Sequence, residues 1–179
     1  MHAIILTAGE GARLGSWTSN RPKGMVPIGN RPILDYLVRG IVKSGVKKIN
    51  MVVGYGKNSV MSYFGDGSSF GAKISYFFQE KRTGTLEAMR IGMSDDISDF
   101  ILVPGDNYVS SDSFSKLRAA RGLALLSGKA DRWSKWGEIE LEKGKPKITF
   151  DSPEAYQRIH FTGIAKLNSE TADELINCS

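Results

Sequence analysis

Short apolar runs that alternate with segments of helical spacing constrain the fold of this chain more than any other feature. The runs cover residues 3–8, 48–54, 72–79 and 99–107. Their β-branched and aromatic residues are typical of strands buried on both faces. Apolar residues in 33–42 repeat at helical spacing, with Pro32 suited to the first turn and Gly45 just past the end. Shorter helices are expected at 58–65 and 85–93. This order predicts an α/β fold with a doubly wound, mostly parallel, Rossmann-like sheet and helices on both faces.

The pattern changes after about residue 130. The stretch 137–150 alternates in polarity around a Gly-Lys-Pro turn signal, which predicts a small antiparallel hairpin in the C-terminal third. One more strand is expected at 160–167, followed by a helix at 169–178 that Ser169 would cap.

Length and composition favour an ordinary globular protein. The 179 residues correspond to a single domain, and 41% of them are hydrophobic. No apolar run is long enough to cross a membrane, and the first strand is too short for a signal peptide. Cys178 is the only cysteine, so we expect a cytoplasmic protein without an internal disulfide. The net charge of +5 suits nucleic acid or a phosphate-bearing ligand, although on charge alone a solvated basic surface is the better explanation.

A glycine-rich loop follows the first strand directly and indicates a phosphate or nucleotide site. Glycines allow backbone N–H groups to approach an anion without a Cβ in the way. A dinucleotide fingerprint that starts at Gly9 and Gly11 would need glycine at position 14, which is Leu14, and Gly15 comes one residue late. The P-loop pattern fails too, because no Gly-Lys pair is followed by serine or threonine.

The residues around the loop are similar to a different signature. The stretch "LTAGEGARL…RPKGMVPIGNRPILDYLV" contains Arg13 in the loop and Lys23 in a Pro-Lys pair, and it resembles the sugar-1-phosphate nucleotidylyltransferases. The resemblance continues in family order through "FFQEKRTGTLEAM" and "ILVPGDN", and so covers at least residues 2–107. It implies the nucleotide-diphospho-sugar transferase fold. Residues 1–110 would then form a nucleotide-binding half, and 111–179 part of a sugar-binding half.

The implied reaction is attack by a sugar-1-phosphate oxygen on the α-phosphorus of a nucleoside triphosphate, with pyrophosphate leaving. Positioning and electrostatic stabilisation dominate such reactions. By resemblance, Arg13 binds the triphosphate and the leaving pyrophosphate, Lys23 bridges both phosphate groups, and Asp106 holds Mg²⁺. His2 and His160 show no metal-ligand spacing and are interpreted as structural.

The resemblance also implies how the base is bound. Gln79, five residues before Gly84, matches a glutamine that pairs with a pyrimidine, and Gly84 and Thr85 match residues that contact base and ribose. A glutamine amide donates to a carbonyl and accepts from a ring N–H, as uracil or thymine requires. The remaining expected nucleotide contacts come from the loop: Ala8, Gly9, Gly11 and Ala12.

The sugar half departs from the family pattern. Gly137 and Gly163 resemble glycines beside the sugar, and Asp151 could accept from a sugar hydroxyl. Ser152, however, stands where the family has a lysine for the sugar phosphate. The family's second metal ligand comes from a segment well after Gly163, and no counterpart is found before Ser179. We therefore expect the chain to bind nucleoside triphosphate and Mg²⁺ but to turn over slowly.

These observations lead to one favoured function and one alternative. The favoured function is a Mg²⁺-dependent sugar-1-phosphate nucleotidylyltransferase that uses dTTP or UTP, with glucose-1-phosphate as the best guess for the sugar substrate. The alternative is a nucleotide-binding homologue of weak or no activity that serves as a regulatory or partner subunit. A nucleic-acid binder is disfavoured, because only the net charge suggests it. No membrane partner is expected, and a homo-oligomer is compatible with the sequence.

Overall fold

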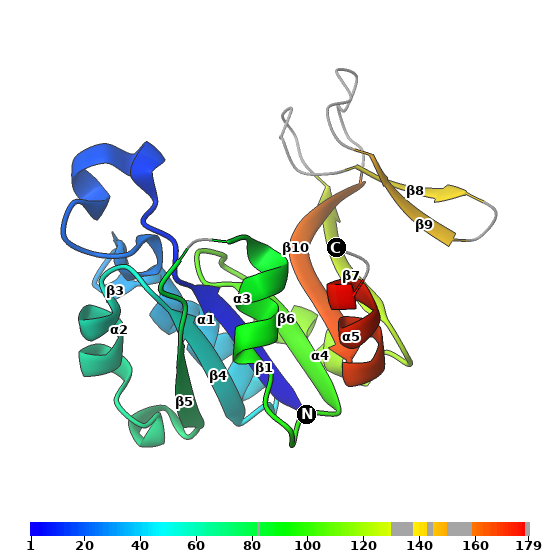
Figure 1. The fold of residues 1–179 in the computed structure, drawn as a ribbon, viewed down its shortest axis with the longest axis horizontal. Helices are drawn as coiled ribbons and strands as arrows, with labels where there is room; N and C mark the ends of the chain where they lie inside the picture. Colours follow the sequence, from blue (N-terminus) through cyan, green and yellow to red (C-terminus); the bar gives the residue numbers. More distant parts are fainter. Residues whose placement is uncertain (82, 130–137, 143–144, 150–158, 178–179) are drawn as a thin grey trace.

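The structure is a computed structural model that describes residues 1–81, 83–129, 138–142, 145–149 and 159–177. A sheet of eight strands runs through it in the order β5-β4-β1-β6-β10-β8-β9, with β7 also paired to β10 (Figure 1). The parallel strands are β1 (His2–Thr7), β4 (Lys48–Val53), β5 (Lys73–Phe78) and β6 (Asp99–Pro104). The antiparallel strands are β7 (Ala124–Lys129), β8 (Glu138–Glu142), β9 (Lys145–Thr149) and β10 (Ile159–Asn168).

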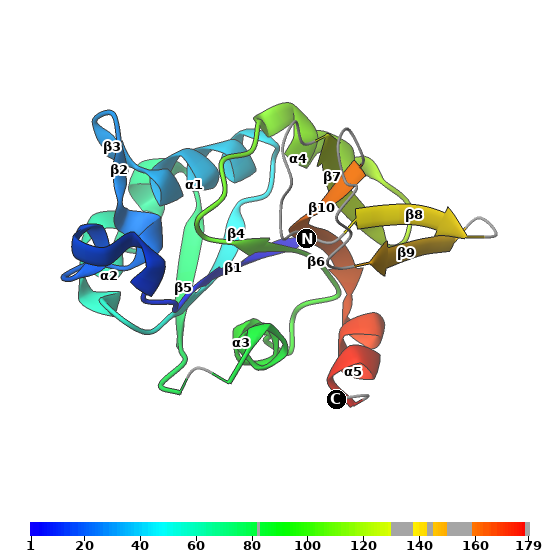
Figure 2. The same cartoon turned by 90° about the horizontal axis from the view of Figure 1, so that it is seen from above.

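Helices cover both faces of the sheet (Figure 2). One face carries α1 (Ile33–Lys43), α2 (Lys57–Phe64) and α4 (Ser111–Ala119), and the other carries α3 (Thr85–Gly92) and α5 (Ser169–Asn177). Short elements complete the described chain: η1 (Ala12–Thr18), η2 (Lys23–Met25), η3 (Ser68–Phe70), and a small separate hairpin of β2 (Pro27–Ile28) and β3 (Arg31–Pro32). The predicted doubly wound α/β fold is confirmed.

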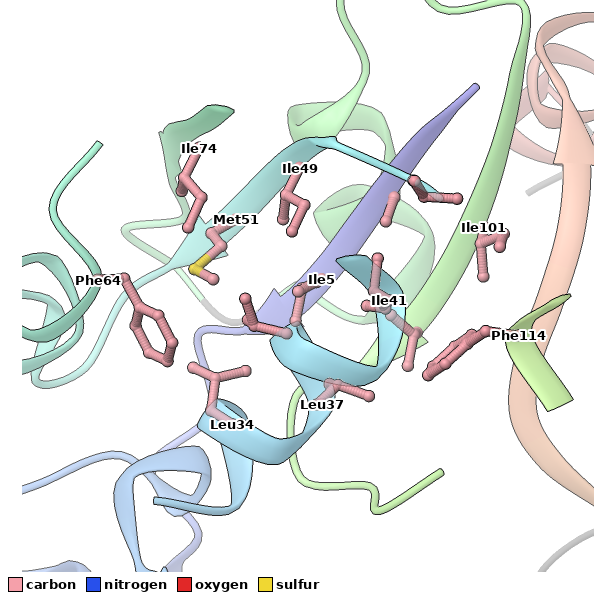
Figure 3. Packing of buried hydrophobic residues seen from close by; sticks show 14 of the residues in the cluster. Ile5, Leu34, Leu37, Ile41, Ile49, Met51, Phe64, Ile74, Ile101 and Phe114 are labelled. Carbon is pink, nitrogen blue, oxygen red and sulfur yellow. The ribbon is translucent and has the colours of Figure 1, made fainter. Parts of the chain in front are cut away.

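Alternation along the parallel strands divides the core into two layers. Ile5 of β1 and Met51 of β4 face α1, where Leu34, Leu37 and Ile41 are fully buried (Figure 3). The intervening strand residues point to the opposite face, against α3 and α5. Each such aliphatic side chain contributes roughly 1.5–3 kcal/mol on burial, so the layers hold the strand ends in fixed positions.

The expected strands and helices of the first 107 residues are all present, and their ends differ by a few residues at most. Gly45 follows α1 with a φ of 93°, as a residue just past a helix end often does. Pro32 was expected in the first turn, but it occupies the N-cap position before Ile33. The hairpin predicted for 137–150 is confirmed by the pairing of β8 with β9, and its turn lies outside the described residues.

Two expectations for the second half need correction. Ser169 does not cap α5: the side chain of Asn168 accepts a hydrogen bond from the Thr171 N–H (2.9 Å), and Ser169 is already the first helical residue. Neither α4 nor β7 was expected from the sequence. Phe114 and Leu117 are the buried residues of α4, so its apolar stripe is narrow.

Candidate functional site

The candidate site lies at the carboxyl edge of the parallel strands, where open α/β sheets bind their ligands. Residues expected to bind nucleotide or metal follow three of the four strands: Ala8 and Gly9 follow β1, Gln79 follows β5, and Asp106 follows β6. Gly54, which was not expected at the site, follows β4. Two pockets open along this edge, and each contains part of this set.

The first, the glycine-lined pocket, has a volume of about 120 Å³. It is lined by Leu6, Thr7, Gly9, Gly11, Lys23, Gly24, Gly105 and Asp106. Three of its glycines are required by close packing. A Cβ on Gly24 would lie 2.9 Å from the Gly105 carbonyl oxygen, and a Cβ on Gly11 would lie 2.9 Å from Cβ of Lys23. A Cβ on Gly105 would lie 2.9 Å from Cβ of Thr7. These contacts bring η2, the loop after β1 and the end of β6 together. Gly9 differs, because no atom lies within 4 Å of the Cβ it lacks, and its bare backbone leaves room for a ligand.

Lys23 and Asp106 meet in this pocket. The Lys23 ammonium donates a hydrogen bond to Oδ2 of Asp106, although the two residues are 83 positions apart. Their side chains are 46% and 24% exposed, and an ion pair at such exposure contributes only about 0–1 kcal/mol. Both charges can therefore exchange partners at little cost. The backbone directly before Lys23 is held in place by Gly56, because Pro22 packs so closely against this glycine that a Cβ there would lie 2.6 Å from Cδ of Pro22.

The loop that contains Arg13 is tied to the end of β4. Gly11 precedes η1 as its N-cap residue in a left-handed conformation (φ 68°), and its carbonyl accepts a hydrogen bond from the Thr18 hydroxyl at 3.0 Å. The Tyr55 hydroxyl lies 3.1 Å from the Thr18 carbonyl oxygen and 2.6 Å from the Ser19 carbonyl oxygen. The Arg13 side chain lies outside the described part of the structure. Tyr55 was missed in the sequence, which gives no sign that it braces a loop so distant along the chain.

The second pocket, the Gln79 pocket, has a volume of about 280 Å³. It is lined by Ala8, Glu10, Val53, Gly54, Tyr55, Lys57, Phe78, Gln79 and Glu80. Gln79 is 7% exposed, and its Nε2 donates to the Gly84 carbonyl at 3.4 Å. The structure thus brings Gln79 and Gly84 together. Gly84 precedes α3 with a φ of 106°, and Thr85 is the first, exposed residue of that helix.

Lys57 and Phe78 are further members of the Gln79 pocket that sequence reasoning did not identify. The Lys57 ammonium lies over the Phe78 ring, 4.8 Å from its centroid. Phe78 ends β5, and Lys57 begins α2, four positions after the end of β4, so both lie at the expected ligand edge of the sheet. That position is the signal that could have singled them out.

The expected sugar-side residues are only partly described. Gly163 lies in β10 with a φ of 80°, and a Cβ there would be 3.2 Å from Cγ of Pro104. The Asn107 amide donates to the Thr162 carbonyl at 3.2 Å, which ties β10 to the strand end that presents Asp106. Gly137 and Asp151 lie outside the described residues. Ala12 begins η1 and is exposed beside the glycine-lined pocket rather than in its lining.

Asp106 has the donor chemistry for a hard divalent cation. It offers a carboxylate at a strand end beside a pocket that also contains a lysine for phosphate. Within the described ranges, no group of three His, Cys, Asp or Glu side chains is placed to hold a metal ion. A cation at Asp106 would thus depend on oxygens of the substrate and of water.

In the part of the chain that the structure describes, none of the helices has the length and apolar character to span a membrane.

The family to which this chain belongs follows from comparison with known proteins. The sequence model of the "Nucleotidyl transferase" family matches residues 2–148, and the chain belongs to this family. The bifunctional protein GlmU of Methanococcus maripaludis strain C5 is 38% identical over 79% of this chain and 33% of its own length. A glucose-1-phosphate thymidylyltransferase of Streptomyces griseus is 37% identical over 70% of this chain and 37% of its own length.

Solved structures share the fold at lower identity. A Bacillus anthracis structure assigned as a glucose-1-phosphate thymidylyltransferase, in complex with sucrose, superposes with a TM-score of 0.85. It is 21% identical and covers 100% of this chain and 76% of that one. A UDP-glucose pyrophosphorylase bound to UDP-glucose has a TM-score of 0.77 at 21% identity, covering 98% of this chain and 79% of that one. The chain spans about a third of the length of the first curated relatives that it matches.

Proposed function

We propose that this chain transfers a nucleotidyl group from UTP or dTTP to a sugar-1-phosphate and releases pyrophosphate. A sugar-phosphate oxygen forms a bond to the α-phosphorus while the bond from that phosphorus to the bridging oxygen breaks. The attacking oxygen is already anionic, so no proton transfer is needed. The observation that supports this proposal is the meeting of Lys23 and Asp106 in a glycine-lined pocket next to the Gln79 pocket. Residues 1–110 would supply the nucleotide half.

Lys23 has the central role in this proposal. Its ammonium is exposed enough to leave Asp106 and reach two phosphate groups, one from each substrate. The main obstacle is the electrostatic repulsion between the two polyanionic substrates. A positive charge between them reduces this repulsion both in the ground state and in the transition state. Arg13, on the same side of the sheet in η1, would add a second charge toward the triphosphate.

Asp106 would hold Mg²⁺ in this scheme. When bound, Mg²⁺ neutralises charge on the phosphate oxygens during phosphoryl transfer. Asp106 would contribute one carboxylate oxygen and orient the triphosphate over the pocket. Moving Lys23 to phosphate leaves that carboxylate without its present partner, so phosphate binding and cation binding would support each other.

A second candidate function is nucleotide binding with little turnover. Ser152 favours it, because that position lacks the charge that the family uses on the sugar phosphate. Gly137, Asp151 and Gly163 would still form the sugar side. Ser152→Lys should then improve sugar-phosphate binding and leave nucleotide affinity unchanged.

Direct titration with UTP and dTTP, beside pyrophosphate release with glucose-1-phosphate and Mg²⁺, tests both candidates. Lys23→Met should weaken triphosphate binding by roughly 1.5–3 kcal/mol, the usual value of a charged hydrogen bond. Lys116→Met removes an exposed lysine of α4 outside both pockets and serves as the matched control. Binding with turnover supports the transferase, and binding alone supports the second candidate. Equal affinities of the two variants for triphosphate would reject the role of Lys23, and failure of the unmodified chain to bind UTP or dTTP would reject both candidates.

A further inference from the structure

We propose that Lys57 is a base-specificity residue, which selects uracil or thymine against guanine in the Gln79 pocket. The proposal rests on the proposed function, since it assumes that the base of the nucleoside triphosphate occupies this pocket. It extends that function by assigning a role to a residue outside the loop, the Pro-Lys pair and the glutamine.

Gln79 alone leaves the choice of base incomplete. Its Nε2 has two N–H groups, and one donates to the Gly84 carbonyl at 3.4 Å. One N–H and Oε1 remain for the base, and together they match a carbonyl beside a ring N–H. Uracil and thymine present that pair as O4 and N3–H, but guanine presents the same pair as O6 and N1–H. A further contact is therefore needed to separate these bases.

The next position along the base edge provides the difference. Uracil and thymine have the O2 carbonyl there, which accepts, whereas guanine has a 2-amino group, which donates. A lysine ammonium offers three N–H donors and no acceptor. It would stabilise the pyrimidine carbonyl and repel the guanine amino group, whose donor it cannot satisfy.

Lys57 is held where it can make this contact. Its ammonium lies 4.8 Å from the centroid of Phe78, the residue directly before Gln79, and both side chains line the same pocket as Gln79. The backbone before it is fixed because Gly56 packs against Pro22. In the part of the chain that the structure describes, Lys57 forms no ion pair that would hold it away from a base.

Two carboxylates of the same pocket, Glu10 and Glu80, make the opposite outcome testable. A carboxylate accepts hydrogen bonds only, so it would favour the guanine amino group. Lys57 is preferred for this contact because its ammonium already lies over the ring of Phe78, which lines the same pocket as Gln79. A guanine preference in the unmodified protein would assign the position to a carboxylate and overturn the proposal.

The experiment compares affinities for UTP, GTP and inosine triphosphate, which keeps the carbonyl and N–H of guanine but lacks the 2-amino group. The unmodified chain should bind UTP most tightly, and inosine triphosphate more tightly than GTP. Lys57→Met should lower UTP affinity by about fivefold to tenfold and remove the difference between inosine triphosphate and GTP. Lys57→Glu should favour GTP. Lys116→Met should change none of these ratios, and thermal unfolding should confirm that each variant is folded.

The outcomes separate this proposal from the proposed function. An equal loss of affinity for all three nucleotides in Lys57→Met would show a general charge effect on the triphosphate and would overturn base selection. Unchanged affinities in that variant, beside weakened binding in Lys23→Met, would also overturn it while the proposed function stands. Failure of the unmodified chain to bind any of the three nucleotides would overturn both.

Discussion

The two pockets share one edge of one sheet, yet they are built differently. In the glycine-lined pocket the backbone determines the shape, and two side chains, Lys23 and Asp106, supply the charge. In the Gln79 pocket the walls are side chains from three separate segments, including Phe78 and Lys57. The first arrangement suits phosphate, which every nucleotide shares. The second suits the base, by which nucleotides differ.

The comparison shows how one fold can separate affinity from specificity. Close contacts at Gly24 and Gly11 leave little freedom for change in the glycine-lined pocket. The Gln79 pocket is larger and partly lined by exposed side chains, since Phe78 is 49% exposed. We therefore expect changes in the first pocket to reduce binding or turnover for all nucleotides, and changes in the second to alter their ranking.

Asp106→Asn should have the largest effect. The amide keeps the size of the side chain but loses the charge that would hold a cation, so turnover should fall roughly 100-fold or more while nucleotide affinity changes little. Asp99→Asn, at the opposite end of the same strand β6, is the matched control. Pyrophosphate release and nucleotide titration would measure the two quantities. If Asp106→Asn changed the ranking of bases instead, the division between the pockets would be wrong.

Gly24→Ala and Gly9→Ala separate packing from ligand space within the glycine-lined pocket. A Cβ on Gly24 would lie 2.9 Å from the backbone oxygen of Gly105, so the free energy of unfolding should fall by roughly 1–3 kcal/mol, together with triphosphate affinity. A Cβ on Gly9 meets nothing within 4 Å, so Gly9→Ala should lower affinity and leave stability within about 0.5 kcal/mol. Denaturant unfolding beside titration with UTP would check both. Equal loss of stability in the two variants would contradict this assignment.

Gln79→Ala, in the Gln79 pocket, should alter the ranking of nucleotides more than their overall binding. The triphosphate contacts remain, so the affinity for UTP should fall modestly, by roughly 1 kcal/mol, because one neutral hydrogen-bonding group is lost. The affinity for ATP should change little, so the preference for UTP over ATP should shrink by about the same amount. Side-by-side titration with UTP, dTTP, ATP and GTP is the measurement. A preference of the unmodified chain for purine nucleotides would contradict the proposal that Gln79 binds a pyrimidine base.

His2→Gln should have the smallest effect and should change neither pocket. Burial lowers the pKa of His2 below its usual 6.5, and the nearby Asp96 only partly opposes this shift. The unfolded chain therefore takes up the proton first as the pH falls below 6.5, and the native state loses stability there. The substitution should flatten the decline in melting temperature as the pH falls below about 6.5. A steeper decline in the variant would show that protonated His2 stabilises the fold.

The sequence by itself determined the parallel half of the fold and the composition of the glycine-lined pocket. The strands β1, β4 and β6 are buried on both faces, and such apolar runs have few alternatives to burial in a parallel sheet, whereas in the edge strand β5 only Ile74 is buried. Gly11, Arg13 and Lys23 lie within one short segment, and their spacing is a local property of the chain. Features of this kind are visible in a sequence because a single residue type satisfies them, such as glycine where a Cβ would collide.

Only the tertiary structure decided the contacts between distant segments. The ion pair of Lys23 with Asp106 and the position of Lys57 over Phe78 depend on which strands are neighbours, and no local pattern encodes that. The helix α4 was missed for the same reason. Its last turn is stabilised by Lys166 of β10, whose buried ammonium donates to the Ala120 carbonyl at 2.5 Å. A weak local preference becomes a stable element when packing supplies the energy, so the partner must be known before the element can be predicted.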